Sequence, residues 1–198
     1  FRLPPRGNET LDRLKYAVLS CTRWESGFFT AYRAAAQQEL DFWLHLGDFI
    51  YEYPEHSQGA VRSGLQPPHE TISLADYRQR FALHRRDADL QALSAAAPLI
   101  AVWDDHEVAN DVWMRGAENH QPDREGSFLE RRAAALRAYH EWMPTHYGAR
   151  GSGPASRRLQ TDPQSWRRWR RFDFGDLASL LLLETRHTAR TTQMAVTR

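Results

Sequence analysis

The stretch Phe42-Trp-Leu-His-Leu-Gly47-Asp48-Phe-Ile-Tyr51 decides the fold, because an apolar run of strand type stops there abruptly at residues that can bind a metal ion. The same design occurs twice more. Tyr16-Ala-Val-Leu-Ser ends at Cys21, and Leu99-Ile-Ala-Val-Trp103 ends at Asp104-Asp105-His106. In an open α/β sheet the carboxyl ends of neighbouring strands converge on one crevice. The three runs therefore predict a ligand site at one edge of a parallel sheet.

The elements around these runs predict a single α/β domain. A strand over 16–21, a helix near 29–40 and a strand over 42–47 form a βαβ unit, whose crossover favours parallel pairing. Further helices are predicted at 73–83 and 87–96, and a third from Ser127, capped with Glu130, to Met143. Two apolar runs around Gly175-Asp176 predict a β-hairpin. Polar stretches at 54–70 and 148–165 are predicted loops.

Composition excludes several classes of protein. With 198 residues the chain fits one domain, and 41% hydrophobic residues suffice for a core. A net charge of +1 gives no general attraction to nucleic acids or membranes. No stretch approaches the roughly 20 apolar residues of a membrane span, and the first residues lack the apolar centre of a signal peptide. The basic-aromatic run Arg167–Arg171 is expected to frame a strand entrance with its Trp packed inward.

The candidate ligands after the strands have two interpretations each. A buried carboxylate such as Asp48 needs compensation, and a cation is the strongest partner, but Asp48 could also cap the next segment. Asp104, Asp105 and His106 could bind metal or form a solvated loop that opens a helix. Cys21 could be a thiolate ligand or a small buried hydrophobe. A thiolate beside carboxylates suggests two unlike ions.

Three arginines are candidates to hold an anionic substrate. Arg23, Arg62 and Arg78 each have the planar donor fork that pairs with phosphate oxygens. Arginines that are solvated or pair with a neighbouring helix residue are commoner, so the sequence does not choose among the three.

Six motifs carry a resemblance to a known family. In chain order they are Val18-Leu-Ser-Cys21, Phe28-Phe-Thr-Ala-Tyr32, His45-Leu-Gly-Asp-Phe-Ile-Tyr51-Glu52, Leu74-Ala-Asp-Tyr-Arg78, Trp103-Asp-Asp-His-Glu107-Val-Ala-Asn110 and Leu183-Glu-Thr-Arg186. Together they resemble the PhoD-like alkaline phosphatases, a family of the metallophosphatase superfamily. The resemblance covers about residues 1–190.

This resemblance implies a metallophosphatase-type αββα sandwich with a dimetal site at strand ends. On that basis residues 1–14 are a linker or domain-entry segment, and residues 15–198 are the N-terminal part of the catalytic domain, about the first half of the sandwich. The implied activity is hydrolysis of phosphate mono- and diesters at alkaline pH, outside the cytoplasm in the periplasm or extracellular space. The implied metals are Fe3+ and Ca2+. A phosphate ester is then the partner, and no nucleic acid is expected as a specific one.

The resemblance also implies roles for individual residues. Cys21 matches the thiolate ligand, Asp48 the bridging carboxylate and Tyr51 the phenolate ligand of iron. Asp105 falls where related metallophosphatases place an asparagine metal ligand. His106 falls where they place the histidine that serves the phosphate or the leaving group. Asn110 is assigned, with His106, to substrate binding, although its role is not separable from that of Asp104.

One departure from the family pattern supports an alternative. The family's remaining ligands come from later strands, including a Gly-Asp-x-His motif, whereas this chain stops twelve residues after Arg186. The family's N-terminal β-sandwich domain is absent as well. The alternative is a truncated, non-catalytic remnant that acts as an interaction module. Half a sandwich should expose an apolar sheet face and an unpaired strand edge, so we expect self-association through that sheet.

Overall fold

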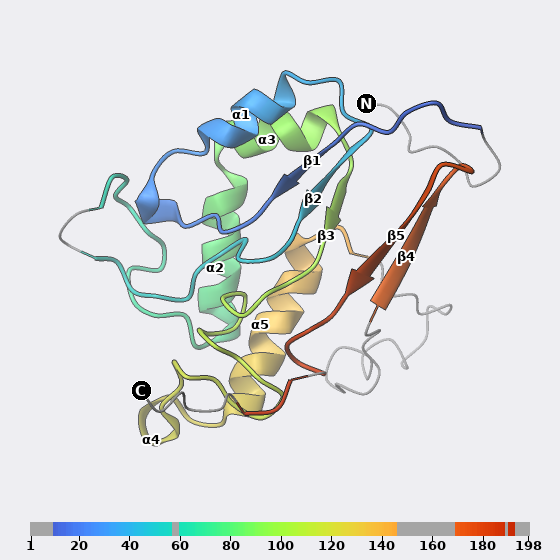
Figure 1. Cartoon of the computed structure of the whole chain (residues 1–198). Helices are drawn as coiled ribbons and strands as arrows, with labels where there is room; N and C mark the ends of the chain where they lie inside the picture. Colours follow the sequence, from blue (N-terminus) through green and yellow to red (C-terminus); the bar gives the residue numbers. More distant parts are fainter. Residues whose placement is uncertain (1–9, 57–59, 146–168, 189, 193–198) are drawn as a thin grey trace, which may run out of the picture.

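The computed structural model describes residues 10–56, 60–145, 169–188 and 190–192, shown in Figure 1. The predicted loop at 148–165, the first nine residues of the entry segment and two arginines of the basic run lie outside the described residues. Among the described residues, no helix has both the length and the apolar character needed to cross a membrane.

A three-stranded parallel sheet forms the centre of the fold. Strands β1 (Tyr16–Leu19), β2 (Phe42–His45) and β3 (Leu99–Ala101) lie in that order, and Leu44 is in register with Val18 and Ile100. Their arrowheads point the same way in Figure 1, so the loops that leave them share one edge. The predicted parallel βαβ unit is confirmed.

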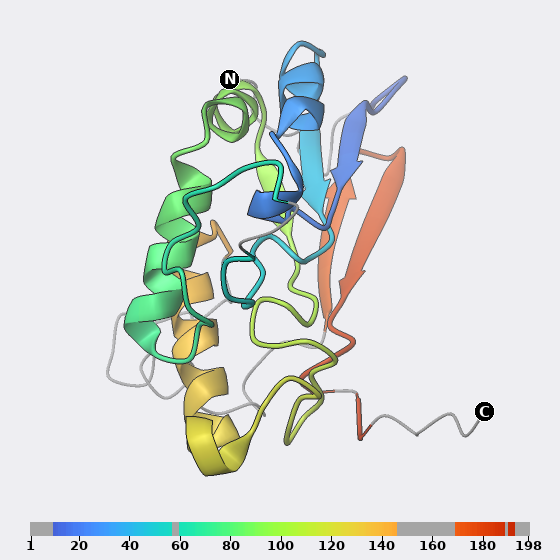
Figure 2. The same ribbon diagram turned by 90° about the vertical axis from the view of Figure 1, so that its left-hand side faces the viewer.

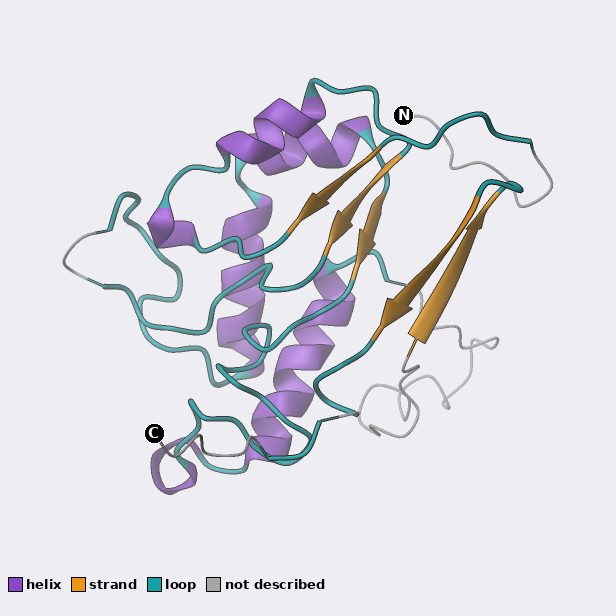
Figure 3. Cartoon of the chain, in the orientation of Figure 1, coloured by secondary structure: helices purple, strands orange, loops and turns teal. Residues whose placement is uncertain are grey.

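Helices cover one face of this sheet, and Figures 2 and 3 show them on the side away from the hairpin. In chain order they are the 3-10 helix η1 (Trp24–Ser26) and the α-helices α1 (Thr30–Ala36), α2 (Leu74–Arg85), α3 (Ala88–Ala96), α4 (Pro122–Glu125) and α5 (Phe128–Trp142). Trp43, fully buried on β2, is part of the core on this side. Helix α1 is shorter than predicted, yet Leu40 beyond its end still packs against the core.

The helix caps differ from the prediction in one place. A capping box forms at α2, where the Ser73 side chain accepts from the Asp76 backbone N–H and the Asp76 carboxylate accepts from Ser73. The predicted box at Ser127 is wrong. Ser127 makes no side-chain cap bond, and its backbone carbonyl accepts from the Glu130 N–H instead.

A β-hairpin covers the second face of the sheet. Strands β4 (Trp169–Phe174) and β5 (Ala178–Leu183) pair antiparallel, as predicted. The ring of Phe174 stacks on that of Phe42 with centroids 4.6 Å apart, and Leu182 joins the same cluster. The outer face of the hairpin presents apolar side chains to solvent, among them Trp169, which is 57% exposed. The expectation that this Trp packs inward is wrong, because alternate residues of the strand face the sheet.

Two fully buried histidines make the folded state sensitive to acid. Burial lowers the pKa of His45 to about 3 and that of His84 to about 4. His45 lies on β2 with Nε2 3.0 Å from the Tyr32 hydroxyl, and His84 on α2 lies with Nε2 3.0 Å from the Thr22 carbonyl oxygen. Both are neutral in the native state, whereas an unfolded histidine takes up a proton below a pKa of about 6.5.

We therefore expect stability to fall as the pH drops below about 6.5. Each histidine should cost about 1.4 kcal/mol of unfolding free energy between about pH 7.5 and 5.5, because only the unfolded state binds the proton. Urea unfolding across that range measures the slope. His45→Gln and His84→Gln should each flatten it, and an unchanged slope in both variants would contradict this origin of the acid sensitivity.

Candidate metal centre

The predicted ligands meet around Asp48, at the carboxyl ends of the parallel strands. Asp48, Asp105 and His106 each offer one potential ligand atom, and these three atoms lie within 4.8 Å of one another. The Cys21 thiol lies 3.5 Å from Asp48 Oδ2, and the Tyr51 hydroxyl donates to the same oxygen at 3.2 Å. Loops after three separate strands thus bring a thiol, a phenol, two carboxylates and an imidazole together.

The backbone at two of the predicted ligands is strained. Cys21 and Asp48 adopt left-handed conformations, with φ of 60° and 56°. Residues other than glycine rarely adopt this conformation, and such strain concentrates at functional sites. The Cys21 N–H donates to the Gly47 carbonyl at 3.1 Å, and the Thr22 N–H donates to that of Asp48 at 2.7 Å. These bonds hold the two ligand loops side by side.

Glu107 joins the loop after β2 to the loop after β3. Its carboxylate, with no solvent exposure, accepts from the backbone N–H groups of Asp48 at 3.1 Å, Phe49 at 2.6 Å and Asp104 at 2.7 Å. Burial and the charge of Asp48 raise the pKa of Glu107 to about 8. Sequence reasoning missed this role, and the only signal was its place directly after His106.

Glu52 orients the imidazole of His106. The buried Glu52 carboxylate lies 2.7 Å from His106 Nδ1, and it also accepts from the Asn110 backbone N–H at 2.7 Å and the Asn119 side chain at 2.9 Å. Burial alone would lower the pKa of His106, but the bond to Glu52 and the charge of Asp48 raise it. With Nδ1 held by Glu52, Nε2 on the opposite edge of the ring is the nitrogen left for a ligand or substrate.

Asn110 lies beside this pair, with its side chain turned to another partner. Its Nδ2 donates to Glu118 at 3.0 Å. Its assignment to substrate binding stays a prediction.

Arg80 holds the segment that carries Tyr51 and Glu52. Its guanidinium, on α2 and 1% exposed, donates to the backbone carbonyls of Tyr51, Tyr53, Gln66, Pro67 and His69. Burial lowers the pKa of Arg80 to about 10, and the guanidinium remains charged at neutral pH. One buried cation therefore binds both the residues just before the predicted loop at 54–70 and, where described, the loop itself.

Charge in the centre favours a cation. Burial, together with the neighbouring charges of Asp105 and Asp104, raises the pKa of Asp48. Arg186 offsets part of the negative charge by donating to Asp104 and lying 3.3 Å from Asp105 Oδ1. Burial and the charge of Asp48 also raise the pKa of the Tyr51 phenol, so ionising it needs a positive charge nearby. The donor set suits a trivalent or borderline ion on the thiol and phenol side and a harder ion on the carboxylates.

The three candidate arginines have different partners in the structure. Arg62 pairs with Asp87 at 2.8 Å and stacks on Trp24, and Arg78 pairs with Glu141 at 2.6 Å. The guanidinium carbon of Arg23 lies 5.9 Å from the centroid of the Tyr51 ring, beside the centre. Of the three, Arg23 is the one placed to meet an anion there.

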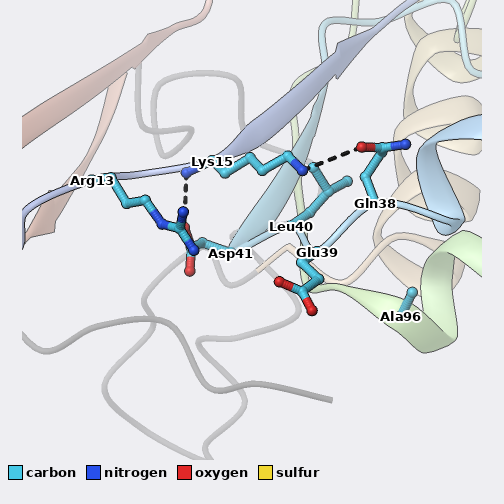
Figure 4. Close-up of a pocket in the computed structure, with 7 residues that line it drawn as sticks. All are labelled: Arg13, Lys15, Gln38, Glu39, Leu40, Asp41 and Ala96. Carbon is cyan, nitrogen blue, oxygen red and sulfur yellow. Dashed lines mark hydrogen bonds between the residues drawn. The ribbon is translucent and has the colours of Figure 1, made fainter.

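One hollow lies at the opposite end of the sheet from the candidate metal centre. This cavity of about 430 Å³, drawn in Figure 4, has Lys15 and Arg13 together with Glu39 and Asp41 in its lining. The Lys15 ammonium donates to Gln38 at 3.2 Å and its backbone N–H to Asp41 at 2.8 Å. Its lining carries charges of both signs, whereas the predicted metal ligands lie at the other edge of the sheet.

Comparison with known proteins gives consistent matches. The family model described as PhoD-like phosphatase matches residues 16–198. The chain is 38% identical to alkaline phosphatase D of Bacillus subtilis (strain 168) over 184 residues, which are 92% of this chain and 30% of that protein. A solved structure titled "Structure of PhoD" aligns with a TM-score of 0.77 at 38% identity, covering 93% of this chain and 33% of that one. The chain thus spans about a third of the length of these relatives.

The loops after β2 and β3 approach so closely that Gly47 has no room for a side chain. A Cβ on Gly47, whose φ is +106°, would lie 2.4 Å from the Asp104 backbone nitrogen. We expect Gly47→Ala to lower the free energy of unfolding by more than about 2 kcal/mol, because backbone rather than a flexible side chain must move.

Gly64→Ala is the matched control for that substitution. Gly64 also has a positive φ, +80°, but a Cβ there meets nothing within 4 Å. It should cost only the backbone term of about 1 kcal/mol. Urea unfolding of the two variants measures the difference, and equal losses would show that the contact with Asp104 does not constrain the loops.

Proposed function

The chain belongs to the PhoD-like phosphatase family, and from this premise we propose that it carries part of a metal-dependent phosphoric ester hydrolase acting on phosphate mono- and diesters. The observation that supports the proposal best is the meeting of Cys21, Asp48, Tyr51, Asp105 and His106 at one sheet edge. Residues 15–198 would be about the first half of a metallophosphatase αββα sandwich, and residues 1–14 its entry segment. The family resemblance supports action in the periplasm or extracellular space.

The ligand residues fit two unlike cations, Fe3+ and Ca2+. Cys21 and Tyr51 would hold the iron, Asp48 would be shared, and Asp105 would complete the site on the harder side. Bound there, the ions would supply Lewis acidity that neutralises the phosphate charge. This assignment rests on the donor set and on the family resemblance.

The chain's own residues would orient the ester and move a proton. The Glu52 carboxylate accepts a hydrogen bond from His106 Nδ1 at 2.7 Å, which fixes the ring and favours the protonated imidazole. This bond leaves Nε2 of His106 for the substrate. From this position His106 would donate a proton to the departing alcohol oxygen. Glu107 keeps the loops that bear Asp48 and Asp105 at a fixed separation.

A non-catalytic interaction module is the second candidate. It is favoured by the exposed outer face of the hairpin, where Trp169 is 57%, Leu181 58% and Leu183 58% exposed. Through this face copies of the chain would self-associate.

Hydrolysis of bis(4-nitrophenyl) phosphate separates the two candidates. With Fe3+ and Ca2+ supplied, both the chain and a form extended at its carboxyl end should release nitrophenol, and equal rates would exclude the interaction module. Activity in the longer form alone would favour the interaction module for the chain itself. No metal-dependent hydrolysis in either form would contradict the proposed function.

Glu52→Gln tests the histidine pair within that assay. We expect kcat to fall about 100-fold for an alkyl ester and much less for a nitrophenyl ester, because only the poor leaving group needs a proton from His106. Glu118→Gln, which removes a carboxylate bonded to Asn110, is the matched control and should have little effect. Equal losses on both esters would assign Glu52 a purely structural role.

Tyr51→Phe tests the iron ligand by a spectroscopic signature. Iron bound by a phenolate should colour the protein through charge transfer, and loss of the Tyr51 hydroxyl should abolish or strongly shift that visible band. Tyr53→Phe removes the hydroxyl of another ring beside His106, 5.3 Å between centroids, and should leave the band in place. A band that survives unchanged in Tyr51→Phe would refute the assignment.

A further inference from the structure

A hollow opens beside the metal centre, between the end of β1 and the start of α1. Its volume is about 230 Å³, and its lining combines apolar side chains such as Leu19 and Phe28 with the polar side chains of Ser26 and Arg23. Phe28 lines the hollow and is 63% exposed, so a ligand can reach this residue. A single ring group fits such a volume better than a drug-sized ligand, which takes roughly 300–1,000 Å³.

Two residues belong to both the hollow and the surroundings of the centre. Cys21 lines the hollow, and its thiol lies 3.5 Å from Asp48 Oδ2. Arg23 also lines it, and its guanidinium carbon lies 5.3 Å from the Tyr53 ring centroid and 5.9 Å from that of Tyr51. A phosphate at the centre would therefore have the hollow as its neighbour across Cys21 and Arg23.

The guanidinium of Arg23, between the hollow and the centre, has N–H groups available to a ligand. Among the described residues its carboxylate contact is Glu25 at 3.6 Å, longer than a hydrogen bond, and Glu25 already accepts from the His56 N–H at 2.6 Å. A guanidinium both pairs with phosphate oxygens and stacks on flat rings.

We propose that this hollow is the subsite for the organic group of the phosphate ester and that it prefers an aromatic ring. Phe28 packs against that ring, and Arg23 donates to an outer oxygen of the phosphate. The inference rests on the proposed function and extends it to a class of substrate, aryl phosphate esters over small alkyl ones. Phe28 and Arg23 then have separable effects, one on the ring and the other on the phosphate.

Binding of three probes to the metal-loaded protein tests the subsite. Calorimetry would compare the Kd of phenylphosphonate, methylphosphonate and inorganic phosphate, since the P–C bond of a phosphonate is not an ester that the protein could hydrolyse. We expect phenylphosphonate to bind about tenfold more tightly than methylphosphonate, because stacking on a side-chain ring favours it. Phe28→Ala should bring that ratio close to one, and Phe28→Trp should preserve it. Arg23→Gln should weaken all three probes by a similar factor.

Arg33→Gln is the matched control. Arg33 lies on α1 outside the hollow, 62% exposed and paired with Asp89 at 2.8 Å, and its loss should change no Kd. A phenyl-to-methyl ratio near one in the parent protein, or one that survives Phe28→Ala, would overturn the subsite while leaving hydrolysis intact. Failure to bind any probe, together with failure to hydrolyse bis(4-nitrophenyl) phosphate, would overturn the proposed function and the subsite with it.

Discussion

The close approach of the loops after β2 and β3 is the constraint on which the rest of this structure depends. Gly47 lies against the backbone of Asp104 with no room for a Cβ, and Glu107 joins the two loops through three amide donors. This approach brings Asp48 from one loop to Asp105 from the other. Parallel strands alone bring their ends within one crevice, but the glycine contact and the buried carboxylate set the separation on which a shared ligand depends.

Crowding the acids has an electrostatic cost that the fold offsets only in part. Arg186 offsets Asp104 and Asp105 from one side. Asp48 faces Cys21 and Tyr51, neither of which carries a positive charge, and the charge of His106 offsets only part of its own. The pKa of Asp48 is raised, mainly by burial and also by the negative charges of Asp105 and Asp104. A bound cation corrects it directly, since it favours the ionised forms of carboxylate, thiol and phenol together. The arrangement is thus better suited to a cation than to a set of neutral hydrogen bonds.

Much of this centre could be predicted from sequence, because strand ends and ligand types are local signals. The positions of Cys21, Asp48 and Asp105 follow from where three apolar runs stop. The supporting residues could not be predicted. Glu52 and Glu107 look like ordinary acids in sequence, and their roles arise from backbone amides that the tertiary fold brings to them. The Ser127 cap fails for a related reason, because a permitted sequence pattern does not determine which of two acceptors on a serine is used.

The residues of the candidate centre lie on irregular backbone, whereas the core is built from regular strands and helices. The strands end at Leu19, His45 and Ala101, before the residues of the candidate centre. Cys21 and Asp48, two of the predicted ligands, adopt left-handed conformations that a strand does not allow. Irregular segments normally move, but here Arg80 binds five backbone carbonyls, three of them in the loop at 54–70, and Glu52 binds groups from three loop positions. The buried charges of Arg80 and Glu52 thus hold these loops through hydrogen bonds, in place of the backbone pairing that holds a strand in a sheet. The centre can then take a shape set by chemistry while the parallel sheet and its helices supply the stability.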